Sequence, residues 1–266
     1  MFIIAENINI MSARLGPAIK KKDRAVLQDV ARKLEAAGVD AIDVNIGPAR
    51  KDGPEVMTFL VETLGEVVRC PLCLDTTNAE AMEAGVARCV QLGLPKPIIN
   101  SFSLQRDRRD AFLALAAQYE CEIIGLTMET AIPASAADRL NLAFELVAAA
   151  NEAGVPNERI LIDPVVLPLS VDVGQQHAQA VLEVVSTVPD MFDPPVRTVC
   201  GLSNISNGVP AHLRSPMNNV FLAMLAARGL NAAIGDVLDP EFMRTVRLVR
   251  AYRNESLFSV TDAELQ

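Results

Sequence analysis

The sequence has no tryptophan, two tyrosines and two histidines in 266 residues. So few aromatic rings argue against a platform on which single-stranded nucleic acid could stack its bases. Basic residues are also in deficit, because 24 lysines and arginines stand against 33 aspartates and glutamates, for a formal net charge of −9. Since nucleic-acid binding needs a basic face, we expect no nucleic-acid partner.

Long apolar runs are missing as well. No run reaches the ~18 residues that a membrane-spanning helix needs, so no membrane partner is expected. The first ten residues, MFIIAENINI, lack the basic start and small-residue cleavage site of a secretory signal and are typical of a strand. Five cysteines are an odd count, and most lie in apolar segments. This pattern favours free thiols and a cytoplasmic location.

Several chemistries have no motif in this chain. His177 and His212 have no Cys or Glu at ligand spacing, so no bound metal is expected. Cys70 and Cys73 form a C-x-x-C at a strand start, where positions i and i+3 face opposite sides, which favours core packing. The sequence contains no G-x-G-x-x-G, no G-x-x-x-x-G-K-[ST] and no G-x-S-x-G. Nicotinamide, nucleotide and acyl-serine chemistry are therefore disfavoured.

Eight short apolar runs rich in β-branched residues predict eight strands, and segments with helical periodicity lie between them. The predicted strands are Phe2–Glu6, Ala41–Gly47, Pro71–Thr76, Pro97–Ser101, Glu122–Thr127, Arg159–Pro164, Arg197–Asn204 and Ala232–Asp236. Their spacing leaves room for one helix and two loops each time. We predict an α/β fold, a (β/α)8 TIM barrel in which residues 1–266 form a single domain; a doubly wound open sheet is the alternative.

Local signals place several helix ends. An apolar stripe that starts at Val26 predicts a helix ended by Gly38. Asn78 is a good N-cap for the helix after the third strand. Pro216 and Pro240 are predicted to open the last two helices, since proline is favoured in the first turn.

Polar residues stand at the ends of nearly all the predicted strands. They are Glu6, Asn7, Asp43, Asn45, Asp75, Asn100, Asp163, Ser203, Asn204 and Asp236. In a barrel these positions converge on the C-terminal face, where such enzymes keep their active sites. One such residue is readily explained as a helix cap or a turn residue, but six or more are not. A ring of carboxyl and carboxamide groups suits a neutral heterocycle rich in hydrogen-bonding groups, and not a phosphate.

The segments that hold these residues resemble one known family. They are Ala5-Glu6-Asn7-Ile8-Asn9, Asp43-Val44-Asn45-Ile46-Gly47-Pro48, Cys73-Leu74-Asp75-Thr76-Thr77-Asn78, Ile99-Asn100-Ser101, Leu161-Ile162-Asp163-Pro164 and Gly201-Leu202-Ser203-Asn204-Ile205-Ser206. Together they are similar to the methyltetrahydrofolate:corrinoid protein methyltransferases. The folate domain of cobalamin-dependent methionine synthase and dihydropteroate synthase are more distant relatives of that family. The resemblance extends from Phe2 to about Arg250.

The resemblance implies a barrel that binds tetrahydrofolate or 5-methyltetrahydrofolate in its mouth. By position, Asp75, Asn100 and Asp163 match the residues that hydrogen-bond the pterin ring, and Asn204 matches the asparagine that approaches N5. Further residues that match the same mouth or its loops are Glu6, Asn9, Asp43, Asn45, Gly201, Ser203 and Arg214. Asn7 departs from the pattern, because an arginine stands there in the closest members of the family.

The implied reaction moves a methyl group between N5 of the folate and the cobalt of a corrinoid. Because a tertiary amine is a poor leaving group, N5 needs a polar group that responds to it in the transition state, and we assign Asn204 and Asp75 as catalytic residues. The chain lacks the D-x-H-x-x-G signature of a cobalamin domain, so the corrinoid is expected on a separate partner protein. The resemblance also implies a homodimer. The residues do not determine the direction of transfer.

Three other functions remain open. A dihydropteroate synthase would want a basic residue at the end of the sixth or seventh strand, whereas the run ending at Asn204 has no lysine there. A non-catalytic folate-binding subunit of a methyl-transfer complex would share the polar ring without turnover. A barrel acting on sugars would need paired carboxylates beside aromatic platforms, in which this chain is poor.

Overall fold

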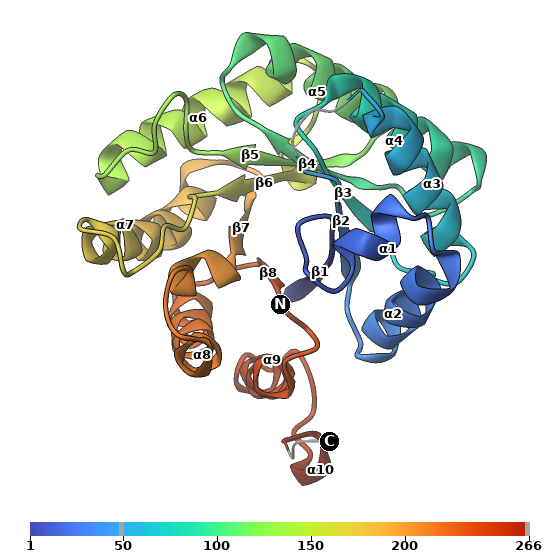
Figure 1. Cartoon of the computed structure of the whole chain (residues 1–266). Coiled ribbons are helices and arrows are strands. Elements are labelled where there is room, and N and C mark those ends of the chain that lie inside the picture. Colours follow the sequence, from blue (N-terminus) through green and yellow to red (C-terminus); the bar gives the residue numbers. More distant parts are fainter. Residues whose placement is uncertain (48–50, 264–266) are drawn as a thin grey trace.

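The computed structural model describes residues 1–47 and 51–263. Each strand pairs in parallel with the next, and the last pairs with the first, so the sheet closes into a barrel with helices around it (Figure 1). The predicted (β/α)8 fold in a single domain is thus confirmed, and the open sheet was the wrong alternative. Pro48, which ends the second motif, lies outside the described residues. Among the described helices, none is long and apolar enough to cross a bilayer.

The strands are β1 Phe2–Asn9, β2 Ala41–Asn45, β3 Leu72–Asp75, β4 Ile98–Phe102, β5 Glu122–Leu126, β6 Ile160–Asp163, β7 Arg197–Gly201 and β8 Ala232–Gly235. The helices are α1 Gly16–Lys20, α2 Arg24–Ala36, α3 Gly53–Gly65, α4 Ala79–Gln91, α5 Arg106–Gln118, α6 Ala136–Glu152, α7 Gly174–Thr187, α8 Ala211–Ala227, α9 Pro240–Tyr252 and α10 Val260–Ala263, with 3₁₀ turns η1 Asn157–Arg159, η2 Val188–Met191 and η3 Leu202–Ser206.

Two apolar layers hold the barrel together, and strand alternation separates them. Side chains on one face of the strands fill the barrel interior, among them Ile4, Ile98 and Leu161. Their neighbours in sequence, such as Ile3 and Ile162, point outward and pack beneath the helices. Because successive side chains of a strand alternate between the two faces, a residue two positions beyond an interior residue also points inward. This rule places the polar residues at the strand ends inside the mouth.

Two strand boundaries differ from the predicted ones in ways that affect the mouth. β1 continues to Asn9, and its pairing with β2 shifts register between Ala5 and Ile8, so Glu6 lies in a bulge. Bulges of this kind re-aim side chains next to active sites. β7 ends at Gly201, three residues earlier than predicted, and the chain turns into η3. Ser203 and Asn204 therefore lie on a 3₁₀ turn and not on a strand.

The helix predictions were partly confirmed. Asn78 caps α4 by accepting a hydrogen bond from the backbone N–H of Ala81, and Pro240 opens α9. Pro216 lies inside α8, so its predicted role as a helix opener was wrong. In the stripe predicted for α2, Val30 and Leu34 are buried, whereas its first residue, Val26, is 41% exposed and Leu27 is buried in its place.

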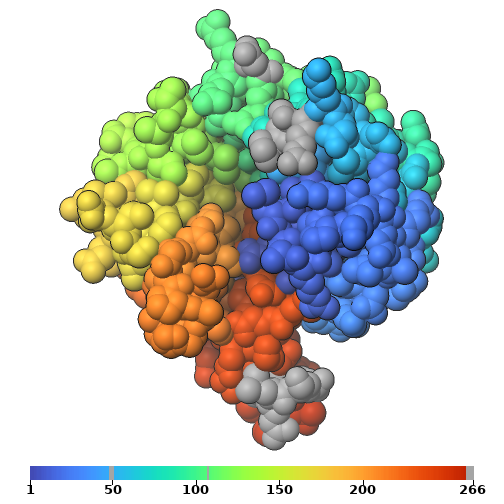
Figure 2. Space-filling view, in the orientation of Figure 1, coloured from blue at the N-terminus to red at the C-terminus, as the bar shows by residue number. Residues whose placement is uncertain are grey.

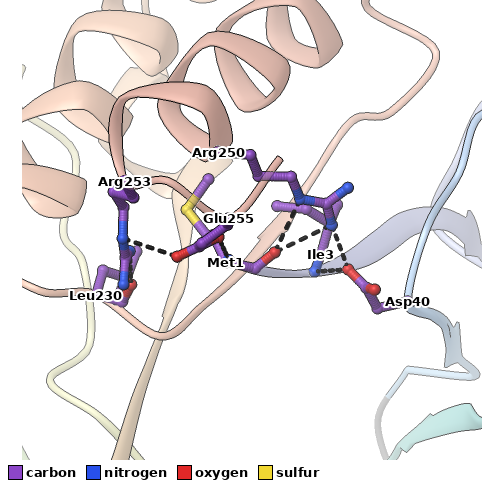
Figure 3. A network of polar contacts seen from close by, with 7 residues as sticks. All are labelled: Met1, Ile3, Asp40, Leu230, Arg250, Arg253 and Glu255. Atoms are coloured by element: carbon purple, nitrogen blue, oxygen red, sulfur yellow. Dashed lines mark hydrogen bonds and ion pairs between the residues drawn. The ribbon is translucent and has the colours of Figure 1, made fainter. Parts of the chain in front are cut away.

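At the end of the barrel away from the mouth, α9 is tied to the start of β1 (Figure 3). Arg250 donates to the carbonyl oxygen of Met1 at 3.0 Å and to the carboxylate of Asp40 at 2.6 Å. The same Asp40 carboxylate accepts the backbone N–H of Ile3 at 2.7 Å. Arg253 donates to the carbonyl oxygen of Leu230, just before β8. These contacts join α9 and the residue that follows it to the β8–β1 seam, where the sheet closes.

Candidate active site

The mouth of the barrel is lined by the polar residues that follow the interior apolar layer. Alternation carries the inward face from Ile98 to Asn100 and from Leu161 to Asp163. The register aligns Asp43 with Cys73, and Asp75 with both Asn45 and Asn100, so these side chains are neighbours on adjacent strands. The space-filling view shows this face hollowed at its centre, between the blue N-terminal segment and the orange segment around α8 (Figure 2).

One polar pair crosses the mouth from β2 to β4. Asp43 is 3% exposed, and its Oδ1 accepts a hydrogen bond from Nδ2 of Asn100 at 3.1 Å. Burial is the main reason that the pKa of Asp43 lies well above its ordinary value of 3.8, and the nearby Asp75 raises it further. The Cys73 thiol also hydrogen-bonds this carboxyl group. Asn100 is thereby fixed by a partner on another strand.

A second pair joins β2 to β3. Nδ2 of Asn45 donates to Oδ2 of Asp75, while Oδ1 of Asn45 accepts the backbone N–H of Gly47 at 2.9 Å. With both ends engaged, the amide has one orientation. Burial raises the pKa of Asp75 to about 6, and the hydrogen bond from Asn45 and the charge of Arg108 act in the opposite direction.

Asp163 ends β6 and is 8% exposed. Its Oδ1 accepts the backbone N–H of Val165 at 2.7 Å, and the backbone N–H of Gly201 donates to the same carboxyl group. Burial raises the pKa of Asp163 to about 6, although both of these hydrogen bonds and the charge of Arg139 lower it. Gly201 therefore contributes a backbone donor to the mouth.

The turn η3, which follows β7, brings Ser203 and Asn204 to the side of the mouth across the barrel from β3. The Ser203 hydroxyl donates to Oε1 of Glu6, which joins η3 to the β1 bulge. Asn204 is exposed, and a Cβ added to Gly201 would lie 3.3 Å from Nδ2 of Asn204, so its amide folds back over that glycine. An exposed carboxamide at the rim of a buried carboxyl cluster is free to contact a bound ligand.

The pKa of Glu6, at the β1 bulge, is raised from its ordinary value of 4.5 to about 7. Burial is the main cause and the charge of Asp236 adds to it, while the Ser203 hydrogen bond lowers it. Asn7 donates to Oδ1 of Asp236 at 2.6 Å and so links the β1 bulge to the loop after β8. Asn9 is the last residue of β1, and its Oδ1 accepts the backbone N–H of Met11 in the turn that follows.

Arg214, the remaining predicted site residue, lies near the start of α8, the helix that follows η3. It is exposed and donates from Nε to the carbonyl oxygen of Val209 at 3.1 Å. Two arginines near the cluster were not predicted from the sequence. The charge of Arg108 lowers the pKa of Asp75, and the charge of Arg139 lowers that of Asp163. Both arginines lie in helices, where sequence alone indicates a solvated face, so no sequence signal marks them.

The other chemistry weighed from the sequence lies outside the mouth or in the core. In the described residues no three His, Cys, Asp or Glu side chains are grouped as a metal site would require. His177 is 3% exposed and contacts Arg139. Cys73 is buried in the barrel interior, and neither it nor Cys70 forms a disulfide.

The cluster thus offers carboxyl groups with raised pKa values, oriented carboxamides and backbone N–H groups at the C-terminal mouth of a (β/α)8 barrel. This is the class of site that binds a neutral ligand with many hydrogen-bonding groups. A family described as pterin binding enzyme matches residues 14–236, which is most of the chain. The protein belongs to this pterin-binding enzyme family.

The chain is also similar to individual proteins. The methylcorrinoid:tetrahydrofolate methyltransferase of Eubacterium limosum is 29% identical over 250 residues, which cover 92% of this chain and 89% of that one. The methionine synthase of Mycobacterium tuberculosis is 26% identical over 277 residues, 98% of this chain and 22% of that larger enzyme. Among solved structures, a Yersinia pestis DHPS (dihydropteroate synthase) with a pterine-sulfa conjugate superposes with a TM-score of 0.69 at 17% identity, covering 96% of this chain and 94% of that one. That last likeness shows the fold alone.

Proposed function

We propose that this protein is a methyltransferase that moves a methyl group between the cobalt of a separate corrinoid protein and N5 of tetrahydrofolate. The observation that supports this most directly is the hydrogen-bonded carboxyl and carboxamide cluster at the mouth of a pterin-binding barrel. The name of the E. limosum relative gives tetrahydrofolate as the methyl acceptor, and we propose that direction. By microscopic reversibility the same residues catalyse the reverse transfer.

In this proposal Asp75, Asn100 and Asp163 hold the pterin ring. A pterin presents amino and ring N–H donors beside a carbonyl acceptor along one edge. Carboxylates accept from the donors, and the Asn100 amide, oriented by Asp43, offers both a donor and an acceptor. Because these side chains are already fixed by partners on neighbouring strands, little side-chain freedom is lost on binding. Asp43, Asn45 and Gly201 complete the pocket.

The chemical step is a displacement at the methyl carbon. The lone pair of N5 forms the new C–N bond, the cobalt–carbon electron pair stays on cobalt to give Co(I), and N5 loses its proton. Asn204 contacts N5 and stabilises the change of charge there, with Asp75 in support. Glu6 is bonded to η3 through Ser203, and its pKa of about 7 suits a group that takes up this proton at neutral pH. In the reverse direction Glu6 returns the proton.

The corrinoid is a substrate delivered by a partner protein in this scheme. The mouth opens at the molecular surface (Figure 2), and exposed apolar side chains stand on its rim, among them Met11, Leu213 and Leu238. We propose that the corrinoid protein docks on this rim. A Met11→Glu variant is then expected to lose activity with the corrinoid protein while keeping it with free cobalamin.

The remaining expectations belong to the same proposal. Residues 1–266 act as one pterin-binding domain, and the free cysteines fit a cytoplasmic location. For the homodimer we propose the apolar groove of about 580 Å³ between α7 and α8, where Val220 and Met224 are exposed. Light scattering should give twice the monomer mass, and Val220→Glu should give the monomer mass.

The experiment that tests the function mixes the protein with 5-methyltetrahydrofolate and reduced Co(I) cobalamin, and follows the methyl-Co(III) band. We expect the band to grow, and Asn204→Ala to slow its growth about 10²–10³-fold while the folate Kd from calorimetry changes little. Asn207→Ala, which alters an exposed asparagine three residues away, is the matched control and should behave as wild type. Folate binding without transfer would identify a binding subunit, and absence of both would contradict the proposal.

A further inference from the structure

Arg139 is the largest fully buried side chain in the described part of the chain, at 0% exposed. It lies on α6, whose other buried residues, such as Leu146 and Val147, are apolar. A buried guanidinium needs compensating partners. Among residues 1–47 and 51–263, no carboxylate forms a hydrogen bond or an ion pair with Arg139, so its guanidinium is compensated by other groups.

Those partners are backbone carbonyl groups of two loops at the mouth. Nη1 donates to the carbonyl oxygen of Pro164 at 2.7 Å and to that of Val165 at 3.2 Å, and Nε donates to that of Pro133 at 2.9 Å. Pro133 belongs to the loop after β5, and Pro164 and Val165 belong to the loop after β6. The planar fork of one arginine therefore holds two neighbouring mouth loops together.

The loop after β6 has an uncommon conformation at the residue that Arg139 holds. Val165 has φ +61°, which is in the left-handed region that a β-branched residue rarely adopts. Such a conformation persists only where surrounding contacts impose it. The same Val165 donates its backbone N–H to Oδ1 of Asp163 at 2.7 Å. The orientation of the Asp163 carboxyl group thus depends on the Pro164–Val165 backbone, whose carbonyl oxygens accept hydrogen bonds from Arg139.

His177, from α7, is the remaining partner. Its Nδ1 contacts Nη2 of Arg139, and it is 3% exposed. Because a guanidinium can only donate, Nδ1 must be the acceptor, and the ring is neutral with its proton on Nε2. Burial and the charge of Arg139 lower the pKa of His177, which keeps the ring in this form. His177 therefore fixes the outer end of the guanidinium.

We infer that Arg139 and His177 are positioning residues, which fix the Asp163 carboxyl group for the pterin through the Pro164–Val165 backbone. The pterin part of this inference rests on the proposed function, whereas the link from Arg139 to Asp163 does not. The charged and titratable groups around the Asp163 carboxyl group are Arg139 from α6 and Cys200 from β7. Loss of Arg139 removes a positive charge and also frees Val165.

The first test needs no folate. Carbon-13 NMR of the Asp carboxyl groups follows the titration of Asp163 in wild type, Arg139→Met and Arg139→Lys, with Asp163→Asn used to assign the signal. We expect the pKa of Asp163 to rise from about 6 in Arg139→Met. Arg139→Lys should keep it closer to wild type, since it retains the charge. An unchanged titration in a folded Arg139→Met protein would overturn the inference.

The second test uses methyl transfer. Arg139→Met should raise the KM for folate about tenfold or more, and Arg139→Lys about threefold. In both variants kcat should change less than KM. The matched control is Arg159→Met, which removes an arginine that donates to the carbonyl oxygen of Ala116 at the other end of β6. An equal rise of KM in the control would show a general loss of stability and overturn the inference. Failure of wild type to bind folate would contradict the proposed function while leaving the NMR result intact.

If Arg139→Met does not fold, the His177 variants decide the matter. His177→Asn keeps an acceptor close to the place of Nδ1, and His177→Leu removes it. We expect His177→Asn to retain the wild-type KM and His177→Leu to raise it severalfold. Equal KM values for the two variants would overturn the role of His177 and, with it, the assignment of the pair as positioning residues.

Discussion

Replacing Glu6 by Gln tests the electrostatics of the mouth. Glutamine keeps an oxygen that can accept the Ser203 hydroxyl, so the link between the β1 bulge and η3 is preserved. It removes a titrating carboxyl group whose pKa burial has raised from 4.5 to about 7. Between these two values the folded protein holds a proton on Glu6 that the unfolded chain has lost. The neutral form favours folding, so this stability is complete below pH 4.5 and is lost as the pH rises through 7.

The magnitude follows from the two pKa values. At about 1.4 kcal/mol per pH unit, the ionisation of Glu6 costs about 3 kcal/mol of unfolding free energy at pH 8 and about 1 kcal/mol at pH 5. Glu6→Gln does not incur this cost. The difference in unfolding free energy between the variant and wild type should therefore grow in favour of the variant by about 2 kcal/mol from pH 5 to pH 8.

Urea denaturation at pH 5, 6, 7 and 8 measures this difference, provided that both proteins show the same m-value. Effects of the amide that do not depend on pH shift the difference in unfolding free energy equally at every pH. The change of that difference with pH therefore reports the ionisation of Glu6 alone. Ser203→Ala is a useful control, because it removes the hydrogen bond that lowers the pKa of Glu6 and should steepen the wild-type pH dependence. A difference that is constant between pH 5 and 8, or that grows in favour of wild type, would refute the reasoning.

Three further predictions concern binding, helix capping and packing. Asn100→Ala removes the amide that Asp43 orients and should raise the KM for folate about tenfold with a smaller effect on kcat, measured by the methyl-Co(III) band. Asn78→Ala, which removes the N-cap of α4, should instead cost about 1 kcal/mol of unfolding free energy with KM unchanged. Leu161→Ala opens a cavity inside the barrel and should cost about 2–5 kcal/mol in urea denaturation, and a loss under 1 kcal/mol would contradict the packed interior.

Much of the mouth could be predicted from sequence because strand geometry is a local property. Ile98 and Leu161 point into the barrel. Because side chains two residues apart in a strand share a face, Asn100 and Asp163 also point inward. The fold class followed from the repeated strand–helix pattern in the same way. The choice between closed barrel and open sheet depended on the pairing of β8 with β1, which joins the two ends of the chain.

Other features depend on contacts between distant parts of the chain, and the sequence contains no signal for them. Ser203 and Asn204 were placed on a strand, whereas the chain leaves β7 at Gly201 and η3 docks on Glu6, 197 residues from Ser203. The guanidinium of Arg214 hydrogen-bonds the carbonyl oxygen of Val209, a contact that residue type alone does not predict. Local propensity cannot distinguish these outcomes, because each is decided by which partner the folded chain brings within hydrogen-bonding distance.

The sequence by itself determined the strands, their inward and outward faces and the chemical character of the mouth, since these depend on periodicity and residue type. Only the tertiary structure decided which carboxyl group pairs with which amide, how far each pKa rises, and that Arg139 is buried. The physical reason is that burial and hydrogen bonding are properties of a residue's surroundings. For Arg139 those surroundings are the carbonyl groups of two loops that meet only when the barrel has closed.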